Sequence, residues 1–212
     1  MGSFLTILED SSAEYVEKRS RFIANLRHCE TEEEASAFLD EMRSKYWDAR
    51  HNVFAYSVAG GTLCRFSDDG EPHGTAGKPI LDVIVGSEIK NIAIVVTRYF
   101  GGVLLGTGGL VRAYSKSAKD AVNNAKVVEM IPCTVYKTVC EYTDHQRLVS
   151  IIENAGGKIE NTEFTDKVTL SYSFRDEDFA PFEIKLSEAF SARLIATETE
   201  KTLTPFEISK NL

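Results

Sequence analysis

The 212-residue sequence contains no apolar run that approaches the roughly 18 residues needed to cross a bilayer. Its first ten residues also lack the basic segment and apolar core of a secretory signal peptide. These two absences argue against a secreted or membrane-embedded protein. We therefore expect a soluble, cytoplasmic chain.

Cysteine is scarce, and its spacing excludes the usual cysteine-based sites. Cys29, Cys64, Cys133 and Cys140 form no CxxC pair, and no histidine stands at zinc-finger spacing from them. Three of the four have apolar or strand-like neighbours, which is typical of buried free thiols in a reducing compartment. The sequence gives no support for a structural zinc site, and we expect neither a metal nor a cofactor.

Acidic residues are missing from one stretch of an otherwise acidic chain. Hydrophobic residues make up 43% and charged residues 26% of the sequence, a mixture that predicts folding rather than disorder. The net charge of −8 argues against nucleic-acid binding driven by overall charge. Residues 89–119, however, contain no Asp or Glu, and their cations are Lys90, Arg98, Arg112, Lys116 and Lys119.

Hydrophobic periodicity predicts alternating strands and helices up to a boundary near Pro132. Period-two alternation indicates a half-buried strand, and Thr31 with Glu34 forms a capping box that predicts a helix. Residues 80–85 fit either a strand or a buried helical turn. The other predicted elements are strands at 21–28, 52–59, 62–66, 91–97 and 127–131 and helices at 32–46 and 108–124.

The remaining residues follow the order strand, helix, strand, strand, helix, strand, which is the βαββαβ arrangement of ferredoxin-like domains. Thr143 with Gln146 predicts a second capping box. The strands are expected at 134–142, 158–164, 168–174 and 194–198, and the helices at 144–154 and 177–190. We therefore predict an α+β protein with two domains, residues 12–131 and 134–208.

A glycine-rich turn, residues 101–109 (GGVLLGTGG), precedes a predicted helix. It does not match a Walker loop, because Thr107 follows Gly106 where that motif requires Lys. It does not match a dinucleotide fingerprint either, because Val111 stands where that motif requires a small residue. Backbone amides at a helix start still favour anions, and the cations of this helix recur along one side. The alternative is that the glycines permit close packing and the cations are merely solvated.

An arginine and two aromatic residues, Arg98, Tyr99 and Phe100, follow the strand at 91–97. Aromatic rings beside cations hold single-stranded RNA by stacking, although aromatic residues here also fit a structural core. The predicted anion-binding or RNA-binding residues are therefore Arg98, Tyr99, Gly108, Gly109, Arg112, Lys116 and Lys119.

The loop 67–78 (SDDGEPHGTAGK) contains three acids and one histidine: Asp68, Asp69, Glu71 and His73. In an extended segment, the last three would project on one side at period two. Such a cluster can bind a divalent cation or act as a general acid and base. Carboxylates in Gly-Pro loops also satisfy turn amides, so a structural role stays open. His51 is a further candidate for this cluster.

Two segments, residues 66–80 (FSDDGEPHGTAGKPI) and 96–115 (VTRYFGGVLLGTGGLVRAYS), closely resemble the signature of the IMPACT/YigZ family. The resemblance covers about residues 12–130, and the C-terminal part is similar to the extra domain of bacterial members. It implies a ribosomal protein S5 domain 2-like fold followed by a ferredoxin-like domain, a pair that resembles the last two domains of translocation elongation factor G. The signature loop includes Asp68, Asp69, Glu71, His73 and Thr75.

The resemblance implies a protein that contacts ribosomes, RNA or translation factors, and it brings no catalytic residues. Our leading hypothesis is a non-enzymatic regulator of translation that binds through the basic glycine-rich surface. One alternative is a metal-assisted hydrolase or phosphotransferase that uses the acidic loop. Another is a protein-interaction module. The sequence does not indicate the oligomeric state.

Overall fold

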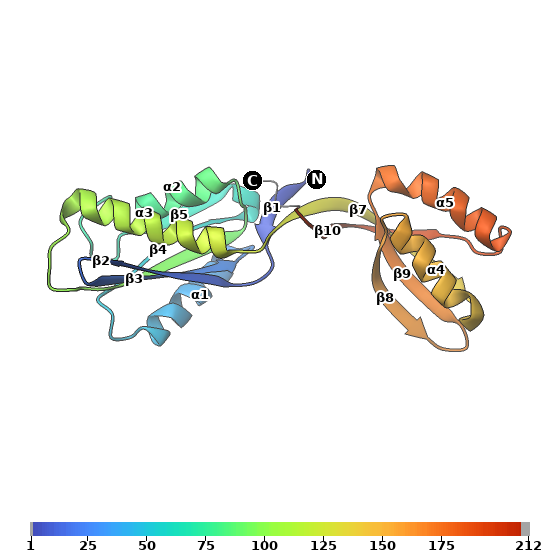
Figure 1. Ribbon diagram of the computed structural model, residues 1–212, viewed down its shortest axis with the longest axis horizontal. Coiled ribbons are helices and arrows are strands. Elements are labelled where there is room, and N and C mark those ends of the chain that lie inside the picture. Colours follow the sequence, from blue (N-terminus) through green and yellow to red (C-terminus); the bar gives the residue numbers. More distant parts are fainter. Residues whose placement is uncertain (1, 209–212) are drawn as a thin grey trace. The chain divides into compact units, whose positions relative to one another are not determined.

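The computed structural model describes residues 2–208 and divides into two compact units (Figure 1). Within the described part, the N-terminal unit comprises residues 4–129 with 207–208, and the C-terminal unit comprises residues 2–3 with 130–206. The fold is α+β with two sheets. No helix within residues 2–208 is both long and apolar enough to cross a membrane.

The N-terminal unit is built on a five-stranded antiparallel sheet with the order β2-β3-β6-β4-β5. Alternation in β3 places Phe22, Ala24 and Leu26 on one face, and all three are fully buried, as the period-two pattern predicts. The strands are β2 (Ser11–Glu17), β3 (Ser20–His28), β4 (His51–Val58), β5 (Leu63–Ser67) and β6 (Ile92–Tyr99), and the 3-10 turn η1 (Ala59–Gly61) joins β4 to β5.

Helices cover both faces of this sheet (Figure 1). Helices α2 (Gly77–Ser87) and α3 (Gly106–Asn124) pack on the face that carries Phe22, through residues such as Ile80 and Tyr114. Helix α1 (Glu32–Lys45) packs on the other face, with Phe38 and Met42 against residues of β4 and β6. The central strands are thus shielded on both faces, which explains why β6 is a nearly unbroken apolar run.

Several local features of this unit differ from the sequence prediction or go beyond it. Residues 4–17, for which the sequence predicts no element, contain two strands, β1 (Phe4–Ile7) and β2, and residues 80–85, which fit either a strand or a helical turn, belong to helix α2. Val111 of α3 is 37% exposed and lies outside the buried face of this helix. Thr31 caps α1 as predicted by accepting the Glu34 N–H, whereas the Glu34 carboxylate accepts the Glu30 N–H and not that of Thr31.

The C-terminal unit follows the predicted βαββαβ order, in which β7 pairs with β9 and β10, and β8 pairs with β9. An aromatic cluster that includes Tyr172, Phe174 and Phe182 fills the space between sheet and helices. The elements are β7 (Val127–Cys140), α4 (Tyr142–Asn154), β8 (Lys158–Phe164), β9 (Val168–Phe174), α5 (Asp176–Phe190) and β10 (Thr197–Glu207).

Three predictions for this part of the chain are wrong in detail. Strands at 127–131 and 134–142 are one continuous strand, β7, which passes through Pro132. The last strand begins at Thr197 rather than at Leu194. The capping box at Thr143 does not form, because α4 begins at Tyr142 and no side chain caps it.

All four cysteines are free thiols, and Cys29, Cys133 and Cys140 are buried as expected. Burial raises the pKa of Cys29 to about 12, and burial also raises the pKa of Cys133 and of Cys140. Cys64 lies partly exposed on β5. Cys29, Cys133 and Cys140 are therefore poor nucleophiles in the folded protein.

Candidate functional site

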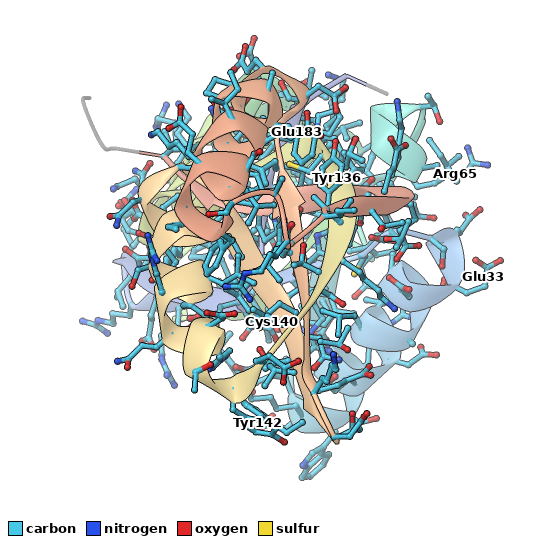
Figure 2. All side chains as sticks on the ribbon, turned by 90° about the vertical axis from the view of Figure 1, so that its right-hand side faces the viewer. Glu33, Arg65, Tyr136, Cys140, Tyr142 and Glu183 are labelled. Carbon is cyan, nitrogen blue, oxygen red and sulfur yellow. The ribbon has the colours of Figure 1, made fainter. Side chains whose placement is uncertain are left out.

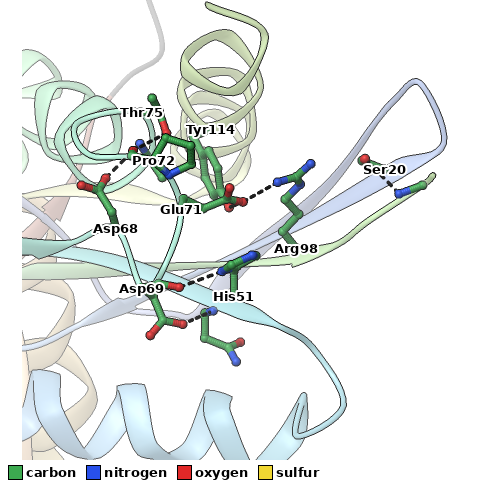
Figure 3. A network of polar contacts seen from close by, with 12 residues as sticks. Ser20, His51, Asp68, Asp69, Glu71, Pro72, Thr75, Arg98 and Tyr114 are labelled. Carbon is green, nitrogen blue, oxygen red and sulfur yellow. Dashed lines mark hydrogen bonds and ion pairs between the residues drawn. The ribbon is translucent and has the colours of Figure 1, made fainter. Parts of the chain in front are cut away.

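The signature loop, residues 67–78, is held in shape by its own carboxylates, beginning with Asp68 (Figure 3). Asp68 Oδ2 accepts the N–H of Gly74 at 2.8 Å, and Oδ1 accepts the N–H groups of Ala76 at 3.1 Å and Gly77 at 2.9 Å. Burial raises the pKa of this carboxyl, but the three backbone donors outweigh burial and leave the pKa lowered. Asp68 thus accepts hydrogen bonds from backbone amides just before and at the start of α2. This is the structural role expected of a carboxylate in a Gly-Pro loop.

Asp69 joins the loop to the first residues of β4. The Asn52 N–H donates to Asp69 Oδ2 at 2.6 Å, and His51 Nδ1 lies 2.7 Å from the Asp69 carbonyl oxygen (Figure 3). Arg43 Nη2 of α1 lies 3.7 Å from Asp69 Oδ1. His51 therefore does belong to this cluster, and its ring fixes the backbone of the loop.

Glu71 forms a buried network with Arg98 of β6 and Tyr114 of α3 (Figure 3). Arg98 Nη1 donates to Glu71 Oε1 at 2.6 Å, and the Tyr114 hydroxyl donates to the same oxygen at 2.8 Å. Burial and the Glu71 charge raise the pKa of Tyr114, so the phenol stays protonated and donates. Arg98 Nε is buried without a hydrogen-bond partner among residues 2–208. The network ties the loop, the sheet and α3 together.

The acidic loop does not gather into a metal site. The His73 side chain is fully exposed, and Thr75 donates its hydroxyl to the Pro72 carbonyl oxygen at 2.7 Å. Asp68, Asp69 and Glu71 each serve a different partner instead of facing one point. Across the described residues 2–208, no group of three or more His, Cys, Asp or Glu side chains is placed to hold a metal ion. The loop is therefore not extended with Asp69, Glu71 and His73 on one side, which is the arrangement that the metal-binding alternative requires.

The predicted role of Arg98 as a phosphate contact also needs correction. Its side chain is only 8% exposed and is neutralised by Glu71, so it does not face a ligand in solution. Tyr99 is half-buried, and its hydroxyl donates to Asp48 Oδ1 at 2.7 Å. Phe100 is 51% exposed and is the aromatic residue of this segment that remains available for stacking.

Helix α3 does place the other predicted cations on the surface. Arg112, Lys116 and Lys119 are exposed, and Gly108 and Gly109 lie in the first turn. A Cβ at Gly109 would lie 2.9 Å from the Leu105 Cβ, which explains this glycine by packing. Lys116 Nζ lies 2.5 Å from Asp120 Oδ1, whereas Arg112 forms no ion pair within residues 2–208.

A cavity of about 250 Å³ lies between α3 and the β2–β3 hairpin. Lys18, Arg112 and Lys116 line it, together with Tyr15 and Glu17, and Glu17 accepts the Tyr15 hydroxyl at 2.8 Å. Lys119 lies instead in a separate groove of about 550 Å³ between α2 and α3. The structure therefore brings Arg112 and Lys116 together around one cavity and separates Lys119 from it.

The hairpin turn, Lys18 and Arg19, is a basic feature that the sequence analysis missed. Both residues have positive φ, 47° and 67°, in the left-handed region that favours glycine. The sequence before this turn carries only a weak strand signal: Ala13 and Tyr15 alternate with Glu14, but the apolar Val16 is exposed on the polar side. The sequence therefore does not indicate where this strand ends and the turn begins.

Gly101 anchors the glycine-rich loop to this hairpin turn. Its N–H donates to the Ser20 hydroxyl at 3.1 Å (Figure 3). A Cβ at Gly101 would lie 2.1 Å from the carbonyl carbon of Arg19, so only glycine permits this approach. The loop between β6 and α3 is thereby held beside Lys18 and Arg19.

Known proteins resemble both parts of the chain. Residues 18–122 match the family described as Impact N-terminal domain, and residues 138–193 match a Domain of unknown function (DUF1949). The IMPACT family member YigZ of Escherichia coli (strain K12) is 40% identical over 187 residues, which cover 85% of this chain and 91% of that protein.

Similarity extends over nearly the whole length in two further cases. The IMPACT family member YvyE of Bacillus subtilis (strain 168) is 32% identical over 201 residues, which cover 94% of this chain and 93% of that protein. A crystal structure described only as that of a hypothetical protein is 37% identical, with a TM-score of 0.60 over 94% of this chain and 98% of that one.

Proposed function

The chain belongs to the IMPACT family, and on that basis we propose that it is a non-enzymatic regulator of translation that binds ribosomal RNA. The binding surface is the basic face, which we define as Lys18, Arg19, Arg112 and Lys116. The observation that carries the proposal is the convergence of Lys18, Arg112 and Lys116 on one cavity in a chain of net charge −8.

Charge balance around the cavity favours a phosphate. Three cations line it with a single acid, Glu17, which is already engaged by the Tyr15 hydroxyl. Arg112 and Lys18 form no ion pair within residues 2–208, so their charges are available to an incoming anion. Contacts of this kind position a nucleic acid by its backbone, and they carry no base sequence.

An exposed aromatic and apolar loop adjoins the basic face. Phe100 is 51% exposed and Leu104 is 83% exposed, and Gly101 fixes this loop against the hairpin turn. Single-stranded RNA is held by stacking of bases on aromatic rings next to cations. Phe100 is therefore proposed as the stacking residue, in place of the half-buried Tyr99.

We further propose that the two units are an S5 domain 2-like domain and a ferredoxin-like domain. The βαββαβ order with adjacent β7 and β9 supports the second assignment. Because this pair of domains resembles the last two domains of translocation elongation factor G, the ribosome is the proposed source of the RNA. This step rests on likeness of fold.

Charge reversal tests the proposal. Binding of the full chain to purified bacterial ribosomes and to an oligouridylate of about ten nucleotides is measured at several salt concentrations. Arg112→Glu with Lys116→Glu should abolish binding to both at physiological salt. Either substitution alone should make the negative slope of log affinity against log salt less steep by about 0.7 for single-stranded RNA, because one phosphate contact is lost.

A matched control is Lys158→Glu with Lys201→Glu, two exposed positions of the C-terminal unit that change the net charge by the same amount. These substitutions should leave RNA binding largely unchanged. Equal losses in both double variants would mean that only overall charge matters. Ribosome binding that survives nuclease treatment and the α3 substitutions would favour a protein partner instead.

A further inference from the structure

A groove of about 520 Å³ runs along the second half of α5 and the segment 191–196 that follows it. It lies within the C-terminal unit and shares no residue with the basic face. The apolar part of the lining consists of Ile184 and Leu186 from the helix and Ala192, Leu194, Ile195 and Ala196 from the segment.

Large aliphatic side chains are unusually exposed at this groove. Ile184 is 62% exposed and Ile195 is 73% exposed, although other isoleucines of this unit, such as Ile152, are fully buried. Apolar side chains that gather in a depression and stay exposed to water are typical of interaction sites. Covering the two isoleucines would remove apolar surface from water and favour binding.

The groove is built rigidly. The Thr138 hydroxyl, which is almost fully buried, donates to the Ile195 carbonyl oxygen at 3.1 Å and lies 2.7 Å from the Tyr172 hydroxyl. Ser191 and Ala192, which follow α5, both have positive φ, 51° and 57°, a conformation that is costly for residues with a Cβ. Strain of this kind persists where the surrounding structure holds it in place, and it clusters at functional sites.

The rim of the groove is acidic. Both charged residues that line it, Glu183 and Glu188, are carboxylates, and neither forms an ion pair in the part of the chain that the structure describes. Glu183 projects from α5 in Figure 2. A phosphate backbone would be repelled here, and a second copy of a chain with net charge −8 is also disfavoured.

We infer that this groove docks a basic amphipathic segment of a partner protein. Aliphatic side chains of the segment would cover Ile184 and Ile195, and its flanking Lys or Arg residues would face Glu183 and Glu188. Charge complementarity sets the choice of partner, and burial of the aliphatic side chains supplies most of the affinity. The inference is independent of RNA binding, because the groove shares no residue with the basic face.

Site-specific photocrosslinking in cells tests this assignment. A photoreactive phenylalanine derivative is placed at residue 184 or 195 of the full chain, and as a control at Val139, which is 52% exposed on β7. We expect both groove positions to capture one protein through the same Lys/Arg-rich apolar segment, and Val139 to capture it at background level. Capture of a second copy, of RNA, or of nothing above the control would overturn the inference.

A synthetic peptide of the captured segment then gives a binding constant. Ile195→Asp should weaken its binding by about tenfold or more, since one aliphatic contact is lost. Glu183→Lys with Glu188→Lys should weaken it further at low salt, whereas Glu160→Lys with Glu163→Lys, an equal charge change on β8, should not. Unchanged binding in both groove variants would overturn the inference, and ribosome binding should be unaffected throughout.

Discussion

Arg98 Nη1 and Glu71 Oε1 lie 2.6 Å apart, with side chains that are only 8% and 4% exposed. Arg98→Met leaves the Glu71 carboxylate buried without its cation, and we expect the free energy of unfolding to fall by about 3 to 5 kcal/mol. Glu71→Gln with Arg98→Met removes both charges and should recover much of this loss. Urea denaturation of the full chain measures both variants.

The control for this pair is Arg21→Met, which breaks an ion pair with Glu14 on the solvent face of β2 and β3. Water and salt screen that pair, so its loss should change the urea midpoint little. A double variant that is as unstable as Arg98→Met alone would show that packing, and not an unpaired charge, causes the loss.

Asp68 should make the stability of the N-terminal unit depend on pH. Its pKa is lowered in the folded state, so its contribution is complete above the ordinary aspartate pKa of about 3.9 and is lost as pH falls through the folded value. Comparison of the chain with Asp68→Asn by urea denaturation from pH 6 to pH 2 should show a stability difference that shrinks at the acid end.

Asp40→Asn removes an exposed carboxylate of α1 and provides the reference for this titration. A difference between the chain and Asp68→Asn that stays constant down to pH 2 would contradict the role given to the three backbone N–H groups.

The cysteines should react with a thiol reagent in two classes. Cys64 is partly exposed, whereas Cys29, Cys133 and Cys140 are buried and have raised pKa values. At neutral pH the folded chain should therefore release one equivalent of thionitrobenzoate quickly and three only on unfolding. Cys64→Ser should remove the fast phase. More than one fast equivalent would indicate that a buried strand opens readily.

Replacing the two residues of the hairpin turn should raise the free energy of unfolding and weaken RNA binding. Lys18 and Arg19 occupy left-handed backbone conformations, for which asparagine and glycine are better suited. Lys18→Asn with Arg19→Gly is expected to raise the free energy of unfolding by about 1 kcal/mol and to weaken RNA binding. Thermal unfolding and ribosome binding, measured on the same variant, check both effects. Unimpaired RNA binding would remove this turn from the basic face.

Most of the fold was predictable where one residue pattern dominates. Strands β8 and β9 have the predicted bounds, and α1 ends within one residue of the prediction. The pattern failed where tertiary pairing decides the structure. β7 continues through Pro132, although proline lacks an N–H for the sheet, and β2 pairs with β3 despite its polar residues.

The candidate site was predictable in its location but not in its internal pairing. The helix that carries the cations was correctly placed, because hydrophobic residues recur at helical spacing along it. Nothing local in the sequence distinguishes Arg98, which is buried, from Arg112, which is exposed. Glu71 and Arg98 meet across 27 residues of sequence, and only the folded sheet brings them together. A cation followed by aromatic residues therefore fits both a ligand contact and a buried ion pair.

Gly101 and Gly102 are adjacent in the sequence, but different features of the structure restrict the residue at each position. Gly102 has a φ of 85° with open space around it, so asparagine is a reasonable replacement, whereas any Cβ at Gly101 meets the backbone of the hairpin. The residue at position 101 therefore separates related sequences that can form this contact between loop and hairpin from those that cannot. A chain that carries a larger residue there cannot hold this loop against the hairpin in the same way, so the proposed RNA-binding role should not be extended to it.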